Sequence, residues 1–225
     1  QRPGSMAFGH EANHRLLACS VSTHARMRVV VRFILPVKEL TRSKRRLLVE
    51  DRVGLVVAMI QDTVAAIRAA DAGPVTVVSP DPKVRDLAEA MGVDFLGHGG
   101  QLNEAIRDAQ RAGMTAAVLP DLPALTAAAL LEVLALAPGF VPDAAGTGTT
   151  MAIDTDLQPV FGPGSAAAFT AGGLPALPAG PGVRCDVDTA QDLARAVGLG
   201  VGPHTSAHLA RRGPARATRT GPRMR

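Results

Sequence analysis

Apolar and polar segments follow one another in a regular order through the middle of this chain. Residues 29–35 form an almost continuous apolar, largely β-branched run, which is typical of a central parallel strand buried on both faces. Residues 49–70 instead repeat apolar side chains at the i, i+3, i+4, i+7 spacing of an amphipathic helix, which Gly73 and Pro74 end. This part of the chain therefore predicts a strand, a polar loop and a helix.

The same alternation continues for three more rounds. Further strands are predicted at residues 75–78, 93–96 and 115–119, and further helices at 82–91, 102–112 and 125–136. Short connections between alternating strands and helices favour an α/β fold with a mostly parallel sheet between two helical layers. We therefore expect a three-layer α/β/α architecture of the Rossmann-like type.

The pattern changes after residue 146. Residues 146–182 are rich in Gly, Pro, Thr and Ser, and predict two short strands and a helix near Ser165. Residues 183–187 then predict a last strand, and residues 190–197 a last helix. A long irregular insert in a regular α/β pattern is where binding loops are usually found.

Length and composition narrow the class of protein. The 225 residues, 47% of them hydrophobic, suit one folded α/β domain. No apolar run approaches the ~20 residues of a membrane-spanning helix, and residues 1–27 lack the pattern of a secretory signal. Two cysteines without a CxxC pair do not make a disulfide framework. We expect a cytoplasmic protein with no membrane partner.

The basic charge lies mainly at the ends of the chain. The net charge is +4, of which residues 211–225 contribute +6 and residues 1–26 contribute +2, which leaves −4 for residues 27–210. An acidic body with a basic tail is not the pattern of a nucleic-acid-binding domain. We predict a poorly ordered extension at 1–26, one domain at 27–203 and a basic, disordered tail at 204–225.

A cluster of cations follows the first predicted strand. Lys38, Lys44 and Arg46 are among five cations in residues 36–47, a loop that connects a strand to a helix. Cations at the carboxyl end of a parallel strand suit a polyphosphate. The loop has no GxxxxGK[ST] pattern, so it is not a Walker loop. From the residues alone, phosphate binding and a solvated basic loop are equally supported.

Acidic side chains follow two other predicted strands. Asp121 comes after residues 115–119, and Asp186 lies in the strand predicted at 183–187. Two carboxylates at neighbouring strand ends can share a hard divalent cation. Taken alone, Asp121 is better explained as a helix cap. We interpret Asp188 and Thr189 as the cap of the last helix and Asp186 as a metal ligand.

Six motifs in order carry a family resemblance, which covers residues 27–203. They are P-V-K-x-L-x-x-x-K-x-R-L, L-N-x-A, x-D-L-P-A-L, G-T-G-T, F-G-P-x-S and R-C-D-V-D-T-x-x-D-L. In this series the chain resembles the phosphoenolpyruvate/2-phospholactate guanylyltransferases, which act early in the synthesis of the deazaflavin redox cofactor F-420. The resemblance implies a compact nucleotidyltransferase fold of the nucleotide-diphospho-sugar transferase type.

The resemblance also implies partners and site residues. The implied substrates are GTP and a phosphorylated three-carbon acid, and the implied cofactor is Mg²⁺ or Mn²⁺. Lys38, Lys44 and Arg46 would be the catalytic cations and bind the GTP phosphates, with Asn103 as a further nucleotide contact. Asp121 and Asp186 would hold the metal. The acceptor acid would be held by Thr149, Gly162 and Ser165. Without the resemblance, Thr149 as strand filler and Ser165 as a helix N-cap are favoured.

Several positions leave alternatives open. Pro120 stands where the family usually has Gly, and it removes a backbone donor next to Asp121. The segment 97–101 is short where a base or ribose would lie, and His98 within it is interpreted as solvated. Cys185 is interpreted as a buried filler. The alternatives are another nucleotidyltransferase of this fold with a different acceptor, or an inactive nucleotide-binding regulator. Both monomer and homodimer are compatible with the sequence.

Overall fold

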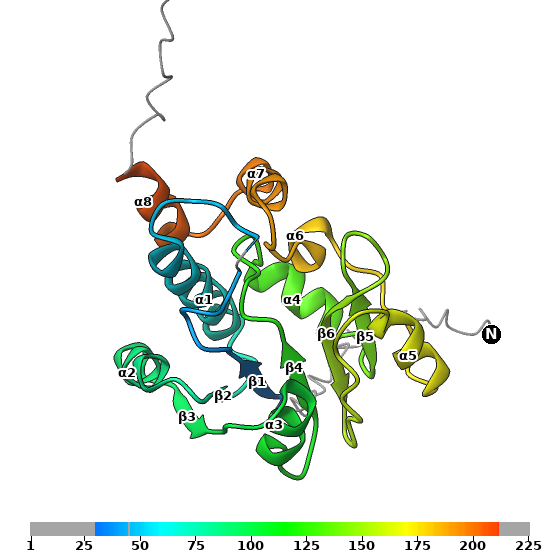
Figure 1. Ribbon diagram of the computed structural model, residues 1–225. Helices are drawn as coiled ribbons and strands as arrows, with labels where there is room; N and C mark the ends of the chain where they lie inside the picture. The colour runs from blue at the N-terminus through cyan, green and yellow to red at the C-terminus, as the bar shows by residue number, and fades with distance from the viewer. Residues whose placement is uncertain (1–29, 45, 212–225) are drawn as a thin grey trace, which may run out of the picture.

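A six-stranded sheet forms the centre of the molecule, with strand order β3-β2-β1-β4-β6-β5 (Figure 1). The structure is a computed structural model and describes residues 30–44 and 46–211. Strands β3, β2, β1 and β4 are parallel, whereas β6 runs antiparallel to both β4 and β5. The strands are β1 Arg32–Pro36, β2 Val75–Ser79, β3 Asp94–Gly97, β4 Thr115–Val118, β5 Gly139–Pro142 and β6 Thr149–Asp154.

Helices cover both faces of this sheet, as the sequence predicts. Alternate residues of β1 belong to two separate cores, with Phe33 and Leu35 in one and Ile34 in the other. The first core contains residues of α1, α2, α4, α6 and α7, and the second contains residues of α3 and α5. The helices are α1 Arg52–Ala69, α2 Pro82–Met91, α3 Leu102–Ala109, α4 Ala127–Leu134, α5 Ser165–Ala171, α6 Pro181–Arg184, α7 Ala190–Leu199 and α8 Pro203–Ala210.

Two details of the predicted order are wrong. Residues 183–187 do not form a strand: Pro181 starts the short helix α6 with its preset φ, and the chain beyond Arg184 is irregular. The sequence predicts two short strands within residues 146–182, but the antiparallel pair is β6 and β5, and β5 begins earlier, at Gly139. The antiparallel pair extends the sheet beyond β4, and Thr149 is the first residue of β6.

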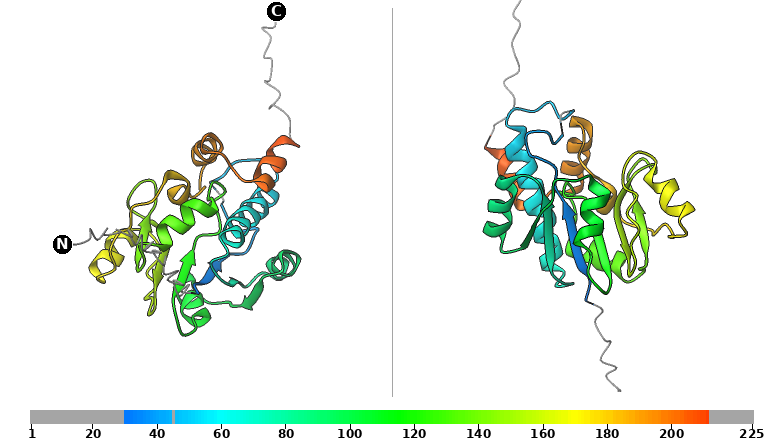
Figure 2. Two further views of the ribbon diagram at one scale, coloured as in Figure 1. Left: turned by 180° about the vertical axis from the view of Figure 1, so that it is seen from behind. Right: turned by 60° about the horizontal axis from the view of Figure 1, so that its bottom comes forward.

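The predicted domain boundary at residue 203 is also wrong. Helix α8 lies alongside α1 in both views (Figures 1 and 2), with Thr205 and His208 buried. The domain therefore continues through α8, and the rest of the predicted tail and the 1–26 extension lie outside the described residues. Within the described chain, no helix combines the length and apolar character needed to cross a membrane.

A buried carboxylate of α1 holds the start of α8. Asp62 of α1 accepts hydrogen bonds from the backbone N–H groups of His204 (2.9 Å) and Thr205 (2.8 Å). These two groups lie in the first turn of α8, where backbone N–H groups have no acceptor within the helix itself. We expect Asp62→Ala to lower the free energy of unfolding by about 2–4 kcal/mol, because both donors would lose a charged acceptor. Urea unfolding measures this, with the exposed Asp86→Ala as the control. An unchanged unfolding free energy would contradict the anchoring role.

Candidate active site

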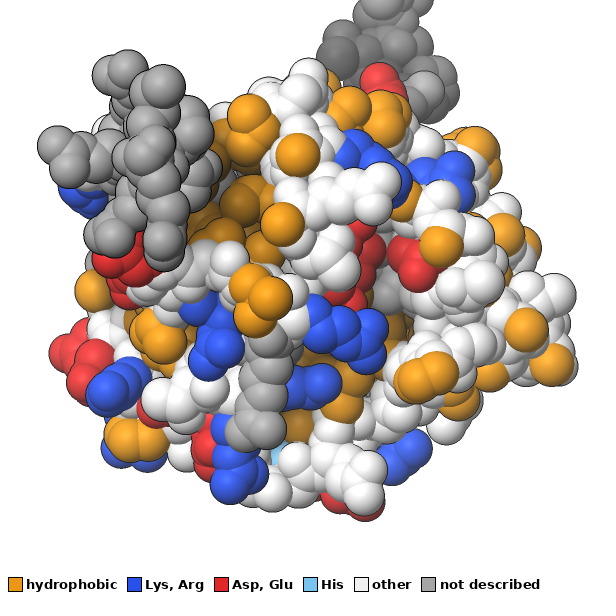
Figure 3. All heavy atoms as spheres, turned by 45° about the horizontal axis from the view of Figure 1, so that its top comes forward, with side chains coloured by type: hydrophobic (Ala, Val, Ile, Leu, Met, Phe, Trp, Pro, Cys, Tyr) orange, Lys and Arg blue, Asp and Glu red, His pale blue; other side chains and the backbone are white. Residues whose placement is uncertain are grey.

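A cleft of about 580 Å³ opens at the carboxyl ends of β1 and β4. Figure 3 looks onto this end of the molecule and shows acidic side chains in a hollow, with Lys and Arg side chains along its rim. The walls are the loop after β1, the turn after β4, and the segments 143–149, 161–165 and 186–188. Eight of the nine predicted site residues line it, namely Lys38, Lys44, Arg46, Asp121, Thr149, Gly162, Ser165 and Asp186.

Three carboxylates meet on one side of this cleft. One oxygen from each of Asp121, Asp186 and Asp188 lies within 4.8 Å of the other two. The Asp121 side chain is almost fully buried, and its Oδ1 atom has no hydrogen-bond partner in the described part of the chain. A buried carboxylate oxygen without a partner, beside two further carboxylates, suits Mg²⁺ or Mn²⁺, which prefer oxygen ligands. The residues present therefore fit a divalent cation.

Asp188 belongs to this cluster and does not cap the last helix. The cap of α7 is Thr189 alone, whose hydroxyl accepts from the Asp192 N–H at 3.2 Å, while Asp192 accepts from the Thr189 N–H at 2.9 Å. The prediction was right for Thr189 and wrong for Asp188. The capping box leaves the Asp188 carboxylate free to point into the cleft.

Lys44 links the basic and acidic sides of the cleft. Its ammonium contacts both Asp121 Oδ2 and Asp188 Oδ1. Burial acts to lower the pKa of Lys44, but the two carboxylates outweigh it and hold that pKa above its usual value. Burial likewise acts to raise the pKa of Asp188, yet the Lys44 charge lowers it overall. Lys44 and Asp188 are therefore a charged pair.

Asp186 has a different electrostatic environment. Burial, followed by the nearby charge of Asp121, raises the pKa of Asp186 to about 7, although Lys44 acts in the opposite direction. The ionised form of Asp186 is disfavoured by burial and by the neighbouring carboxylate. A bound cation would stabilise that ionised form.

The turn that carries Asp121 is held by α1. The Thr63 hydroxyl lies 3.1 Å from the Pro120 carbonyl oxygen and accepts from the Leu122 N–H at 3.2 Å. The Val187 N–H donates to the Asp121 carbonyl at 3.2 Å, which joins the two acidic segments directly. These bonds fix the backbone on both sides of Asp121 although Pro120 has no N–H of its own.

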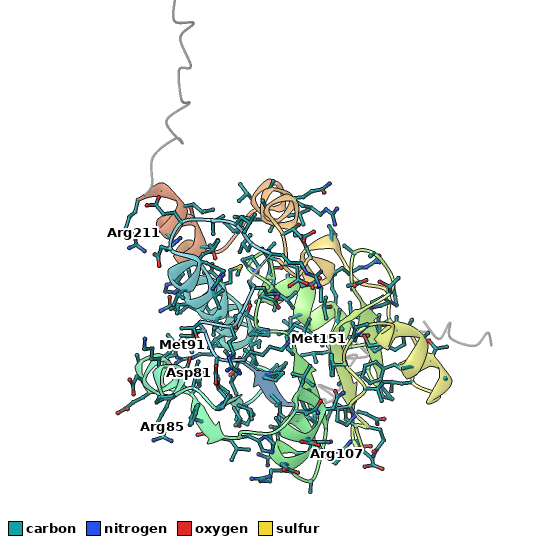
Figure 4. The ribbon with its side chains drawn as sticks, in the orientation of Figure 1. Asp81, Arg85, Met91, Arg107, Met151 and Arg211 are labelled. Atoms are coloured by element: carbon teal, nitrogen blue, oxygen red, sulfur yellow. The ribbon has the colours of Figure 1, made fainter. Side chains whose placement is uncertain are left out.

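The basic loop after β1, residues 36–47, is anchored by the N-cap residue of α2. Asp81, labelled in Figure 4 at the start of α2, accepts from the Leu40 N–H at 2.9 Å, and Leu40 and Leu47 are buried. Arg46, between these anchors, and Lys38, just before Leu40, have exposed side chains at the cleft. Arg42, which sequence reasoning did not single out, lines the cleft with them. The loop thus presents several cations on one rim.

Two buried hydroxyls form another part of the wall. Ser165 Oγ donates to Thr149 Oγ1 at 3.0 Å, and both side chains are buried. The N-cap of α5 is Gly164, in the left-handed conformation with φ of 73°, so the N-cap interpretation of Ser165 is wrong. Gly162, with φ of 139°, gives the loop a turn that other residues rarely adopt. Hydroxyls and exposed backbone N–H groups are suitable donors to an anion.

Asn103 is the predicted residue that does not line the cleft. Its amide donates to the Phe161 carbonyl at 3.0 Å and accepts from the Phe161 N–H at 2.8 Å, so both ends of the side chain are used. A direct nucleotide contact is therefore not what its geometry favours. Asn103 instead holds the start of the segment 161–165.

Asp143 is a cleft residue that the sequence reasoning missed. Its two carboxylate oxygens accept from the Thr147 N–H at 3.0 Å and the Gly148 N–H at 2.9 Å, which fixes the turn that precedes Thr149. The signal in the sequence is an Asp just before a Gly-Thr-Gly-Thr run, a common arrangement for side-chain caps of turns.

Two other candidate groups lie apart from this chemistry. His98 is only partly exposed, and both ring nitrogens have partners: Nε2 lies 2.9 Å from Asp108 Oδ2, and Nδ1 accepts from the Gly100 N–H. Cys185 is buried, and burial raises the pKa of its thiol, which agrees with a filler and not with a thiolate nucleophile. Neither residue lines the cleft.

Comparisons with known proteins show the family of this chain. Residues 31–155, more than half of the chain, match the family described as "Guanylyl transferase CofC like". The chain is 41% identical over 199 residues to a phosphoenolpyruvate guanylyltransferase of Mycolicibacterium smegmatis, which covers 79% of this chain and 89% of that protein. It is 44% identical over 209 residues to the enzyme of that name from Geodermatophilus obscurus, which covers 82% of this chain and 95% of that protein.

A solved structure supports the fold. A nucleotidyl transferase from Methanothermobacter thermautotroptrophicus superimposes with a TM-score of 0.54 at 16% identity, over 74% of this chain and 95% of that one. The predicted nucleotidyltransferase fold is confirmed. With the family match and the identity over most of its length, the chain belongs to the CofC-like guanylyl transferase family.

Proposed function

We propose that this protein is a guanylyltransferase that joins the GMP unit of GTP to phosphoenolpyruvate, or to the similar acid 2-phospholactate, and releases pyrophosphate. The observation that carries the proposal is the cleft itself, in which three carboxylates, several cations and a buried hydroxyl pair face a common space. The relatives named phosphoenolpyruvate guanylyltransferase support that acceptor. The product would be an early intermediate of the deazaflavin cofactor F-420.

The loop after β1 would bind the triphosphate. Lys38, Arg42 and Arg46 extend from it into the cleft, and the Lys44 ammonium lies deeper beside the carboxylates. Cations in these positions neutralise the phosphates of GTP and the charge that develops on the leaving pyrophosphate. Because they are anchored through Leu40 and Leu47, they are held ready for the phosphates.

The carboxylates would hold the divalent cation. Asp121, Asp186 and Asp188 supply the oxygens, and we propose Mg²⁺ or Mn²⁺ as the ion. When bound, such an ion supplies positive charge at the α-phosphate and at the leaving group. Asp121 is held rigidly for this role by Thr63 and Val187.

The acceptor would lie against the hydroxyl pair. Ser165, Thr149 and the backbone of Gly162 would bind its carboxylate or phosphate and aim one phosphate oxygen at the α-phosphorus of GTP. That oxygen forms the new P–O bond while the bond to the β-phosphate breaks and pyrophosphate leaves. A phosphate monoester has a second pKa of about 6, so the oxygen is already anionic at pH 7 and needs no base. Positioning and charge neutralisation are therefore the main tasks of the site.

The proposal is tested by direct assay. The protein is incubated with GTP, Mg²⁺ and one acid at a time (phosphoenolpyruvate, 2-phospholactate or 3-phosphoglycerate), and pyrophosphate release is followed. We expect release with phosphoenolpyruvate or 2-phospholactate that is lost when CTP or ATP replaces GTP. If the folded protein releases pyrophosphate with neither phosphoenolpyruvate nor 2-phospholactate, the proposed function is rejected.

Asn103 gives a further test of the acceptor side. We expect Asn103→Ala to raise the acceptor KM several-fold while the GTP KM changes little, because the two bonds that hold Phe161 at the start of the acceptor segment are lost. Steady-state kinetics with each substrate varied in turn measures this. The opposite pattern, a raised GTP KM alone, would restore Asn103 as a nucleotide contact.

A further inference from the structure

The Lys44 ammonium lies among the oxygens that would hold the divalent cation. It contacts Asp121 Oδ2 and Asp188 Oδ1, which belong to two of the three clustered carboxylates. The Lys44 side chain is only 16% exposed and that of Asp121 only 5%, so their contact is made inside the cleft wall, whereas the Asp188 side chain is about half exposed. The Lys44 ammonium is thus already paired with two of the three carboxylates.

The remaining oxygens do not provide a complete second site. Asp121 Oδ1 is buried without a partner in the described chain, and Asp186 lies beside it. A divalent cation bound there would share the Asp121 carboxylate with the ammonium, a few ångströms from a like charge. Like charges at such short distance repel strongly in a partly buried site. Full occupation of the cluster by a divalent cation and the present position of Lys44 are therefore in conflict.

The backbone around Lys44 is suited to release the side chain. Lys44 itself has φ of 52°, a left-handed conformation that is uncommon for residues with a side chain. Its neighbours Arg42 and Arg46 are exposed, while the loop is anchored on either side by Leu40 and Leu47. The anchors can stay in place while Lys44 turns toward the open cleft, where the triphosphate would lie.

We propose that Lys44 is a removable placeholder for the divalent cation, which pairs with Asp121 and Asp188 until the cation enters and then turns toward the phosphates. The inference rests on the proposed function for its second step only. It implies that the cation and the nucleotide favour each other's binding, since the phosphates give the displaced ammonium a new partner.

Lysine labelling on the unmodified protein tests the displacement. The chain has only three lysines, Lys38, Lys44 and Lys83, so amine acetylation followed by mass spectrometry resolves each of them. At fixed pH and without nucleotide, we expect Lys44 to react at least about tenfold more slowly than the exposed Lys38 and Lys83, because it is buried and paired. Saturating Mn²⁺ should bring the Lys44 rate close to that of Lys38 and leave Lys83 unchanged.

Mn²⁺ affinity gives a second readout. The electron paramagnetic resonance signal of free Mn²⁺ measures binding without nucleotide. We expect Lys44→Met to bind Mn²⁺ at least about tenfold more tightly than the wild type, because a competing charge is removed from the cluster. Lys83→Met, which removes the same charge from an exposed residue of α2 outside the cleft, is the control and should change the affinity by less than about threefold.

The outcomes separate the inference from the proposed function. Lys44 that stays protected when Mn²⁺ is bound would overturn the inference, as would Lys44→Met binding Mn²⁺ no better than Lys83→Met. The labelling needs no variant, so it decides the matter if Lys44→Met does not fold. Neither experiment uses GTP or an acceptor, so a failure here leaves the pyrophosphate assay to judge the guanylyltransferase activity by itself.

Discussion

Asp121→Asn is expected to lower kcat for pyrophosphate release by a factor on the order of a thousand or more. The amide keeps the shape of the side chain but removes the charge of the most deeply buried carboxylate in the cluster. A bound divalent cation contributes several kcal/mol to a phosphoryl-transfer transition state, which corresponds to this loss in rate. Asp186→Asn should have an effect of the same order.

The matched control for these variants is Asp86→Asn. Asp86 is an exposed residue of α2 that does not line the cleft, so the same chemical change there should leave kcat unaltered. Normal turnover of the Asp121 or Asp186 variant with Mg²⁺ would remove that residue from the set of metal ligands.

Asp186→Asn should also raise the melting temperature of the protein in EDTA at pH 8. The pKa of Asp186 is about 7 in the folded state against 3.8 for an ordinary aspartate, so the folded state binds the proton more tightly. The wild type therefore loses stability as pH rises between these values, and the loss is complete above pH 7. The difference between variant and wild type should shrink as pH falls toward 4. An equal melting temperature at pH 8 would contradict this account of the Asp186 environment.

Ser165→Ala is expected to lower kcat/KM for the acceptor by about ten- to a hundredfold with little change in the GTP KM. A hydrogen bond to a charged group is worth roughly 1.5–3 kcal/mol, which gives a loss of this size. Ser165 does not cap α5, but the buried Thr149 hydroxyl loses its partner, so the melting temperature should fall modestly and the acceptor KM is the deciding readout. The measurement is steady-state kinetics with each substrate varied in turn, together with a melting curve.

Thr170→Ala provides the control for Ser165. Thr170 lies on the same helix, and its hydroxyl donates only to the Ala166 carbonyl at 2.9 Å, away from the cleft. It should leave both KM values unchanged. Should Ser165→Ala lower the melting temperature and spare the acceptor KM, its role would be structural and the acceptor pocket would need to be sought elsewhere.

The repeating part of the fold could be predicted because local pattern and tertiary environment agree there. The run at β1 is apolar on successive residues since both of its faces are covered by helices, and the spacing in α1 reflects one buried face. The agreement ends where tertiary contacts, and not the local pattern, determine the backbone conformation. Residues 183–187 have the composition of a strand, but Pro181 starts a helical turn and the segment pairs with the Asp121 turn through a single backbone bond.

The candidate site divides in the same way. The positions of Asp121 and Lys38 follow from their place at strand ends, where parallel strands deliver their loops to one edge. Asp188 was misjudged because its neighbours form a capping box, and a local pattern cannot show that Thr189 caps alone. The sequence could not indicate the contact of Asn103 with Phe161, because the two residues lie 58 positions apart in the sequence. Such side-chain pairings depend on tertiary structure that spacing does not encode.

Asp62 and Thr63 are neighbours on α1, and each of them holds a different segment of the chain. The first binds the start of α8, and the second fixes the turn that carries Asp121. A force applied to α8 would therefore act on α1 at the residue next to the one that holds the turn carrying Asp121. For attachment of the protein to a surface or to a reporter domain, the joint should be made beyond Arg211, with a linker long enough that no load falls on α8.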